Sequence, residues 1–231
     1  VAAGAIASLI LKELGITVSA YTKSIGDIVI PSEEYHYEQI NDNKLYMPNN
    51  DYARKASDYL DHCMERHDSS GGVIECVVNG MPAGIGDPVF QKLDARLASA
   101  IMSIGAVKGI EIGDGFGVST STGSTNNDAF TTEHGKVTKK TNHSGGILGG
   151  MSDGSPIILR AAIKPTPSIS SIQETITQSH KPTSIQIKGR HDPVIVPRAV
   201  VVVESMTAIT LVDLLFTNMS ARMDRLIEFY R

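Results

Sequence analysis

Two pairs of adjacent glycines, Gly145-Gly146 and Gly149-Gly150, constrain the fold of this chain more than any other feature. Glycine adopts positive φ and lets another backbone or a ligand come close, but its backbone entropy makes it costly inside a helix or strand. The apolar run at 156–163 that follows predicts a strand. The segment 142–168 is therefore either a pair of tight turns around an edge strand or a place where a ligand approaches the backbone.

The predicted strand leads into a turn, Lys164-Pro165-Thr166-Pro167-Ser168, in which an ammonium group, two hydroxyls and backbone N–H groups can converge on an anion. Arg190 stands in a similar setting, the segment Gly189–Pro193. Between Arg160 and Arg198 there are six lysines and arginines against two acidic residues, whereas the whole chain has a net charge of −4. Such a basic island focuses a small anionic ligand, unless its charges are scattered over a solvated face.

Composition excludes several classes of protein. The 231 residues are 41% apolar and 20% charged, as in ordinary globular proteins. Aromatic residues make up 5% and tryptophan is absent, so base stacking on nucleic acid is not expected, and the negative charge disfavours a phosphate backbone. No uninterrupted apolar run approaches about 18 residues, so no membrane partner is expected. Cys63 and Cys76 lie in apolar-periodic segments and are predicted to be buried free thiols in a reducing, cytoplasmic compartment.

Apolar periodicity predicts strands alternating with helices. Val1–Gly15 is small or apolar at nearly every position, which predicts a helix that ends at Gly15 and is buried on most sides. Asp87-Pro88 predicts the start of a helix whose apolar face carries Phe90, Leu93, Leu97, Ile101 and Ile104. Near the C-terminus, Ala199–Val203 and Ser205–Phe216 are apolar, and the latter is expected to form a buried helix beneath the site. A further helix is expected at 51–66, with Asn49, Asn50 or Asp51 as its cap. Strands are expected at 17–21, 25–30, 73–78 and 107–112, and polar connections at 31–50, 118–141 and 169–188.

Two histidine segments are acid–base candidates, His191-Asp192 and Asn142-His143. The charge of Arg190 disfavours protonation of His191, and Asp192 is able to relay a proton. Asp192 before Pro193 is also a good turn former, so a purely structural role stays open. No metal site, phosphate-binding loop or nucleophile elbow is expected from the motifs. The other histidines are expected at the surface or at helix ends: His36, His62, His67, His134 and His180.

Five blocks of sequence, in this order and spacing, resemble the chorismate synthase family. They are H-D-S-S-G-G-V-I-E-C (67–76), the stretch from G-I-G-D-P to G-D-G-F (84–116), N-H-S-G-G-I-L-G-G-M-S-D-G (142–154), I-K-P-T-P-S-I (163–169) and G-R-H-D-P (189–193). The opening V-A-A-G-A-I-A resembles the helix that follows the family's R-S-S-A-R-E-T segment. The resemblance covers nearly the whole chain and implies one domain, residues 1–231, that lacks the family's N-terminal segment.

The resemblance implies an α+β fold, a β-α-β sandwich with apolar helices packed between antiparallel sheets, assembled as a homotetramer. It implies the conversion of 5-enolpyruvylshikimate 3-phosphate to chorismate and phosphate, the last common step of the shikimate pathway to the aromatic amino acids. This anti-1,4-elimination needs reduced FMN, which NADPH and a flavin reductase activity would supply.

The resemblance also implies roles for particular residues. The implied catalytic residues are Arg190, which would face the anionic groups of the substrate, and Asp192, which would lie near flavin N5 as a proton relay. Gly105 stands where the family often has asparagine, and Val201–Met206 departs from the family's P-x-x-E-A-M in a way that affects packing. The catalytic histidines of the family's G-E-S-H-G and G-H-A-D-Y motifs are not among these 231 residues, so the residues alone are expected to be inactive. The implied flavin site comprises Gly105, Ala106, Gly149, Lys164, Pro165, Thr166, Pro167, Ser168 and Arg190.

Two other classes of function stay open at this point. The chain is alternatively a non-catalytic anion-binding or oligomerisation module on the same scaffold. Among enzymes, the alternative is a phosphosugar-type isomerase or lyase that uses no flavin.

Overall fold

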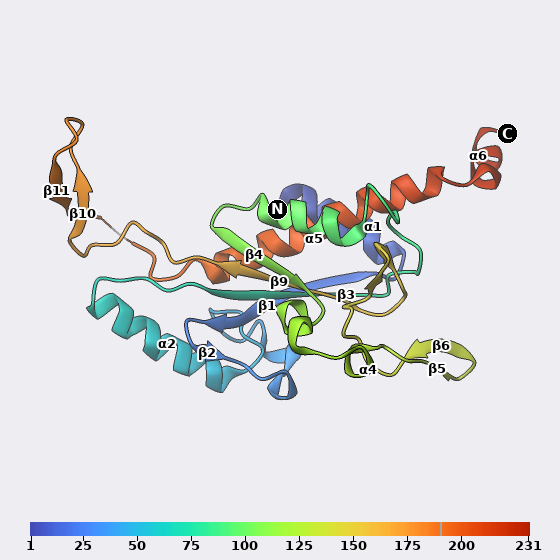
Figure 1. Cartoon of the computed structure of the whole chain (residues 1–231), viewed down its shortest axis with the longest axis horizontal. Helices are drawn as coiled ribbons and strands as arrows, with labels where there is room; N and C mark the ends of the chain where they lie inside the picture. Colours follow the sequence, from blue (N-terminus) through green and yellow to red (C-terminus); the bar gives the residue numbers. More distant parts are fainter. Residues whose placement is uncertain (190) are drawn as a thin grey trace. The chain divides into compact units, whose positions relative to one another are not determined.

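The structure, a computed structural model, describes residues 1–189 and 191–231 (Figure 1). The chain forms two compact units. Unit 1 comprises Val1–Ala20, Glu75–Ala161 and Val201–Arg231, and unit 2 comprises Tyr21–Ile74 and Ala162–Val200. The expectation of one domain over residues 1–231 stays a prediction.

The main sheet has five strands in the order β2-β1-β3-β9-β4. Strands β1 (Thr17–Ile25), β3 (Gly72–Asn79) and β9 (Ile157–Ile163) each continue from one unit into the other along the chain, and β2 (Ile28–Val29) and β4 (Val107–Ile112) are the edges. Every second residue of β9 is buried, the period expected of a strand. The strand predicted at 156–163 is confirmed, but it is an inner strand, so the alternative of an edge strand is wrong.

Helix α1 (Ala2–Glu13) ends where predicted, because Gly15 adopts a φ of +73° and its amide donates to the carbonyl of Lys12. The prediction that this helix is buried on most sides is wrong for the described chain. Only Gly4, Ala7 and Leu11 are buried in it, whereas Ile6 and Leu9 are 63% and 65% exposed. Small and apolar composition indicated a core helix, but only one stripe of it packs on the rest of unit 1.

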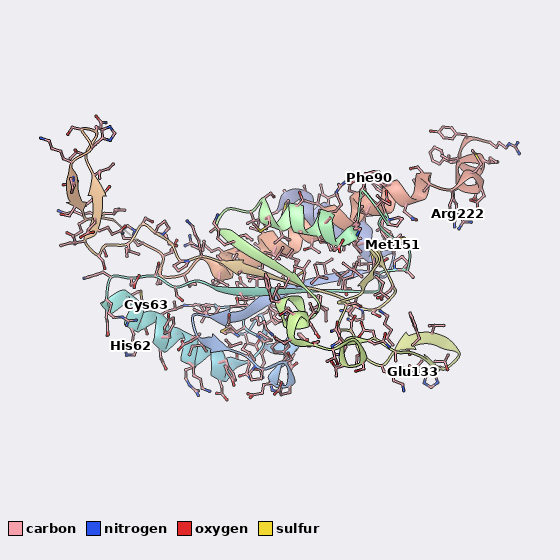
Figure 2. All side chains as sticks on the ribbon, in the orientation of Figure 1. His62, Cys63, Phe90, Glu133, Met151 and Arg222 are labelled. Carbon is pink, nitrogen blue, oxygen red and sulfur yellow. The ribbon has the colours of Figure 1, made fainter. Side chains whose placement is uncertain are left out.

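Helix α3 (Leu93–Met102) begins later than predicted. Asp87 caps a turn instead of a helix, because its carboxylate accepts from the amide of Val89 and its own amide donates to the carbonyl of Gln91. Phe90, labelled in Figure 2, is 88% exposed and does not belong to the apolar face. The prediction is confirmed for Leu93, Leu97 and Ile101, which are completely buried.

The two apolar segments predicted near the C-terminus form one continuous helix, α5 (Val196–Ser220). This helix is long enough to cross a membrane, and its mean hydropathy of 2.0 over an 18-residue window is high enough. The stretch was not predicted as a long apolar run because single charged residues interrupt it. Half of that window is buried inside the protein, as in the core helices of many globular proteins. On unit 1, Ser205 of this helix packs against Gly4 of α1 so closely that a Cβ at Gly4 would collide with it.

Unit 2 contains helix α2 (Asn50–Glu65), which the sequence predicted with Asn49 as a possible cap. The Asn49 side chain accepts hydrogen bonds from the amides of Asp51 and Tyr52 at 3.0 and 3.2 Å. The polar connection before it holds two 3₁₀ helices, η1 (Ser32–Glu34) and η2 (Tyr37–Gln39). Tyr35 and Tyr37 from this connection pack edge-on against the buried ring of Tyr21.

The predicted polar connections contain short elements of their own. The stretch 118–141 contains the end of η3 (Gly115–Thr120) and the short helix α4 (Gly123–Asn126). It also contains the hairpin of β5 (Phe130–Glu133) and β6 (Lys136–Lys139). Residues 169–188 contain the antiparallel hairpin of β10 (Gln173–Ile176) and β11 (Pro182–Ile185). The glycine segment forms the hairpin of β7 (Ile147–Leu148) and β8 (Met151–Ser152), and the chain ends with α6 (Met223–Tyr230).

Candidate functional site

The turn Lys164–Ser168 directly follows β9 in unit 2. Ile163, the last residue of the strand, is 4% exposed, whereas Lys164 beside it is exposed, so the strand delivers its ammonium group to the surface. The Thr166 hydroxyl is buried and has no hydrogen-bond partner among the described residues. A buried hydroxyl without a partner costs about 1–3 kcal/mol, so a hydrogen bond from Thr166 to a ligand or water would stabilise this turn.

The segment Ser69–Gly72 supports this turn from within unit 2. The Ser69 hydroxyl donates to the carbonyl oxygen of Thr166 at 2.7 Å. Gly71 approaches the backbone of Ile163 so closely that a Cβ would collide with its carbonyl oxygen, so only glycine fits there. Ser70 is the next residue along, and its amide donates to the carbonyl of Pro193 at 2.7 Å. Adjacent residues of the H-D-S-S-G-G block therefore hold the K-P-T-P-S turn and the G-R-H-D-P segment together.

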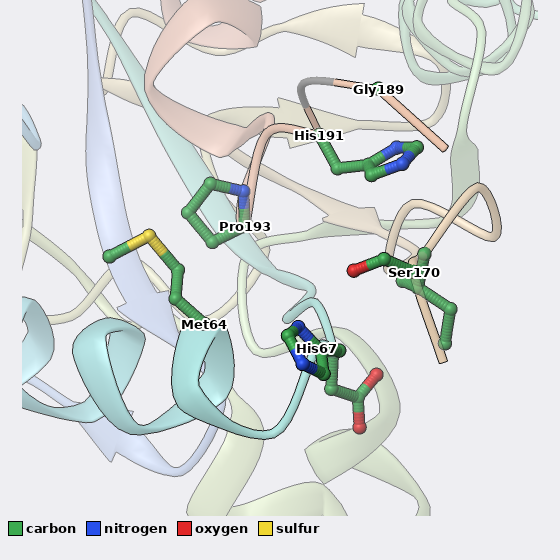
Figure 3. A pocket seen from close by; sticks show the side chains of 8 residues that line it. Met64, His67, Ser170, Gly189, His191 and Pro193 are labelled. Atoms are coloured by element: carbon green, nitrogen blue, oxygen red, sulfur yellow. The ribbon is translucent and has the colours of Figure 1, made fainter. Parts of the chain in front are cut away.

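A small cavity of about 180 Å³ lies in the same unit (Figure 3). His67, predicted only as a surface residue, is exposed as expected and also lines this cavity. One ring nitrogen of His191, Nε2, lies 3.2 Å from the carbonyl oxygen of Ile187. Since a carbonyl oxygen only accepts, Nε2 carries the hydrogen and the other nitrogen is the basic one in the neutral ring. The lining residues are Met64, His67, Asp68, Ile169, Ser170, Gly189, His191 and Pro193.

Asp192 is paired with Arg198, which was considered in the sequence only as one charge of the basic island. The guanidinium of Arg198 donates to both of its carboxylate oxygens, at 2.8 and 3.0 Å. Two parallel bonds of this kind fix the plane of a carboxylate. The structure therefore orients Asp192, whereas Arg190, the other predicted catalytic residue, lies outside the described residues.

The basic residues of the island belong to different parts of the fold. Arg160 belongs to unit 1, where its Nε lies 2.6 Å from a carboxylate oxygen of the buried Glu75 and a second nitrogen lies 3.5 Å from Glu111. Lys181 lies in the turn at the tip of the β10–β11 hairpin. With Arg160 and Arg198 each paired to carboxylates, Lys164 and Lys188 are exposed lysines of the island near the two motif segments.

The predicted flavin residues of unit 1 lie in two glycine-containing turns. Gly149 adopts a φ of +59° in the turn of the β7–β8 hairpin, and both it and Gly105 have open space where a Cβ would be. Ala106 adopts a φ of +70°, a conformation that residues other than glycine rarely adopt and that clusters at functional sites. These features leave room for a ligand to approach the backbone at both turns.

Asp128 anchors the glycine segment, a role that was not predicted from the sequence. Asp128 accepts four hydrogen bonds from residues 141–144: from the hydroxyl of Thr141, the amide of His143, and the amide and hydroxyl of Ser144, all between 2.7 and 2.9 Å. Burial alone would raise the pKa of Asp128, but these donors hold it below its ordinary value. A lone aspartate in a Ser/Thr/Asn-rich stretch gave no signal for this role beyond the unusual length of that stretch.

Lys139 completes this cluster as a buried cation. Its ammonium group pairs with Asp153 and lies 3.9 Å from Asp128, and all three side chains are at most 8% exposed. Burial raises the pKa of Asp153, but the hydrogen bonds from Lys139 and Ser155 and the charge of Lys139 together outweigh it, and the net shift is downward. Next to the cluster, His143 lies 2.6 Å from the carboxylate of Asp114, which orients the ring of this acid–base candidate. Across residues 1–189 and 191–231, no group of three histidine, cysteine or acidic side chains is arranged to hold a metal ion.

Comparison with known proteins gives one consistent answer. A family model described as chorismate synthase matches residues 1–216. The protein named chorismate synthase from Agathobacter rectalis is 61% identical over 231 residues, and that from Archaeoglobus fulgidus is 47% identical over 216 residues.

A solved structure titled as that of a chorismate synthase superimposes with a TM-score of 0.80 at 29% identity and covers 99% of this chain and 66% of its own. This confirms the predicted α+β fold. All 231 residues of this chain align with the Agathobacter relative, but they cover only 63% of that relative's length. The family match, the relatives and the fold together show that this chain belongs to the chorismate synthase family.

Proposed function

We propose that the protein, extended to the length of its relatives, converts 5-enolpyruvylshikimate 3-phosphate to chorismate and phosphate with the help of reduced FMN. The observation that carries the proposal is the way Ser69 and Ser70 hold the K-P-T-P-S turn and the G-R-H-D-P segment together. These are motif blocks of a family to which the chain belongs. The reaction would serve the synthesis of aromatic amino acids.

The exposed ammonium of Lys164 suits a substrate of this kind. The substrate carries a phosphate and two carboxylates, and charge-assisted hydrogen bonds to such groups are about twice as strong as neutral ones. The hydroxyls of Thr166 and Ser168 would add donors in the same turn. Arg190 would bind an anionic group of the substrate, and cations placed there stabilise the charge of the departing phosphate.

Features of each unit, taken separately, support flavin mononucleotide as the ligand. In unit 2 the Thr166 hydroxyl would gain a hydrogen-bond partner, and in unit 1 the turns at Gly105 and Gly149 have open space for a ligand beside the backbone. When bound, reduced FMN supplies electron density for cleavage of the carbon–oxygen bond. The proposed holding residues are Gly105, Ala106, Gly149, Lys164, Pro165, Thr166, Pro167, Ser168 and Arg190.

Asp192 is proposed to hold and pass a proton beside the flavin. Arg198 orients the carboxylate of Asp192, so the carboxylate oxygens are held in fixed positions for proton transfer. The positions of its oxygens depend on this pair, which makes Arg198 a positioning residue for the proposed step.

The setting of the enzyme is likewise proposed. We infer a cytoplasmic homotetramer whose FMN is reduced with NADPH. The motifs G-E-S-H-G and G-H-A-D-Y do not occur in the 231 residues. We therefore propose that the 231 residues alone do not catalyse the elimination.

Two preparations test this proposal, the 231-residue chain and the same chain extended to the length of its relatives. Anaerobic assays with 5-enolpyruvylshikimate 3-phosphate and reduced FMN should yield chorismate only from the extended chain, and titration of FMN fluorescence should show tighter binding to it. Absence of both FMN binding and chorismate formation from the extended chain would refute the proposed function and favour a non-catalytic anion-binding module. Formation of chorismate by the 231 residues alone would refute the proposal that these residues do not catalyse the elimination by themselves.

A further inference from the structure

Three side chains from outside the Lys164–Ser168 turn bind the carbonyl oxygens of that turn and of the residues directly after it. The Ser69 hydroxyl donates to Thr166 at 2.7 Å. The Gln173 amide group donates to Pro167 at 3.0 Å, and the Gln186 amide group donates to Ser170 at 2.9 Å. All of these residues belong to unit 2.

The two glutamines occupy equivalent places at the base of the β10–β11 hairpin. Gln173 is the first residue of β10 and pairs in register with Ile185, the residue before Gln186. The two ends of the hairpin therefore each carry an amide group that reaches back to the segment 166–170. Gln173 thereby ties the polar connection at 169–188 to the predicted binding turn, and Gln186 ties its other end to Ser170, two residues beyond that turn.

The chemistry of these three donors matters for anion binding. A turn binds an anion through its N–H groups and cations, so its carbonyl oxygens, the negative ends of the peptide dipoles, must be directed elsewhere. Serine and glutamine donate hydrogen bonds without carrying a charge. They fix the carbonyl oxygens without adding a cation that competes with the exposed Lys164 for the ligand.

We propose that Ser69, Gln173 and Gln186 are positioning residues for flavin binding. They hold the carbonyl oxygens of Thr166, Pro167 and Ser170 so that Lys164 and the N–H groups of the turn face the anionic ligand. The inference deepens the proposed function and rests on it, because FMN is the ligand in question. None of the three is assigned a contact with FMN or the substrate.

The test is titration of FMN fluorescence against the chain extended to the length of its relatives. Ser69→Ala and Gln173→Ala should each weaken FMN binding about three- to tenfold, the effect expected of one neutral hydrogen bond. Ser69→Thr keeps the hydroxyl and should restore binding to within about twofold of the unchanged protein.

Ser171→Ala is the matched control. The Ser171 hydroxyl also donates to backbone carbonyl oxygens in unit 2, those of Arg66 at 3.2 Å and His67 at 3.0 Å, but not to the turn. Its removal should leave FMN affinity unchanged. The melting temperature of each variant without FMN separates a loss of positioning from a loss of folding.

The outcomes distinguish the two proposals. If the unchanged extended chain does not bind FMN, the proposed function fails and the positioning role fails with it. If that chain binds FMN and Ser69→Ala and Gln173→Ala bind it equally well, the positioning role is overturned while the proposed function stands. An equal loss in Ser171→Ala also overturns it. Should Ser69→Ala fail to fold, Gln186→Ala decides, because its side chain is exposed and its loss disturbs no core.

Discussion

Asp128 and Ser144 are joined by two hydrogen bonds to one carboxylate oxygen, from the Ser144 amide at 2.9 Å and from its hydroxyl at 2.7 Å. Asp128 lies in the polar stretch before the β5–β6 hairpin, and Ser144 stands directly before the first glycine pair. This link fixes the entry of the chain into the glycine segment.

Replacing Asp128 with asparagine should destabilise the protein by about 2–4 kcal/mol, because an amide N–H₂ would face the amide and hydroxyl donors of Ser144. Urea unfolding of the extended chain measures the change. Asp94→Asn is the control, since the half-buried Asp94 accepts a hydrogen bond from the amide of its neighbour Ala95. Equal stability of the two variants would contradict the anchoring role of Asp128.

Acid should destabilise the protein through Asp128 and Asp153. Both have folded-state pKa values below the ordinary value for aspartate, about 3.9, so their contribution to stability is complete above that pH and is lost as pH falls through the lower folded-state values. Unfolding free energies measured from about pH 5 downward should fall, and fall less in Asp128→Asn. An identical pH dependence in that variant would rule this source out.

Replacing Gly4 with alanine should cost about 1–3 kcal/mol, because its Cβ would collide with Ser205 across the contact of α1 and α5. Gly123→Ala, at the start of α4 with open space around it, should be nearly neutral. Combining Gly4→Ala with Ser205→Gly should recover part of the loss. Thermal unfolding of Gly4→Ala, of Ser205→Gly, of their combination and of the control variant tests the contact, and additive losses would argue against it.

Replacing Arg198 with methionine should lower the rate of the proposed elimination about ten- to a hundredfold, because misplaced catalytic groups cost about this much. Affinity for FMN should stay unchanged. Arg222→Met is the control: Arg222 pairs with Asp224 through two nitrogens in the same manner, on an exposed surface. An Arg198→Met enzyme with a normal kcat would show that the pair does not serve the reaction.

Cys63 and Cys76 should be inert toward thiol reagents in the folded protein. Both are buried, and burial raises the pKa of Cys76 to about 12, so its thiolate is absent at neutral pH. A colorimetric thiol assay should detect neither cysteine in native buffer and both in denaturant. Rapid labelling of either one in the folded protein would contradict their burial.

The sequence could predict those elements whose signals are local. Asn49 capped α2 as expected, and Leu93, Leu97 and Ile101 formed one buried face, because caps and helical periodicity act within a few residues. Asp87-Pro88 failed as a helix start because a turn at 87–91 uses the same residues equally well. The exposure of α1 could not be read either, since composition says what a helix is able to bury and not what covers it.

The candidate site was predictable only as motif blocks. Pattern alone located the turn at Lys164 and the segment at Asp192, and the structure adds that Ser69 and Ser70 hold them together. Partners distant in sequence, such as Asp128 for Ser144, leave no periodic or spacing signal. Arg198 was visible as a charge, but its pairing with Asp192 needed the turn geometry before α5.

The chain alternates between its two units along the sequence. It crosses from one unit to the other four times, within β1, β3, β9 and α5. No contiguous stretch of the gene therefore encodes a whole unit. Exchange of any one contiguous gene segment would therefore replace only part of a unit.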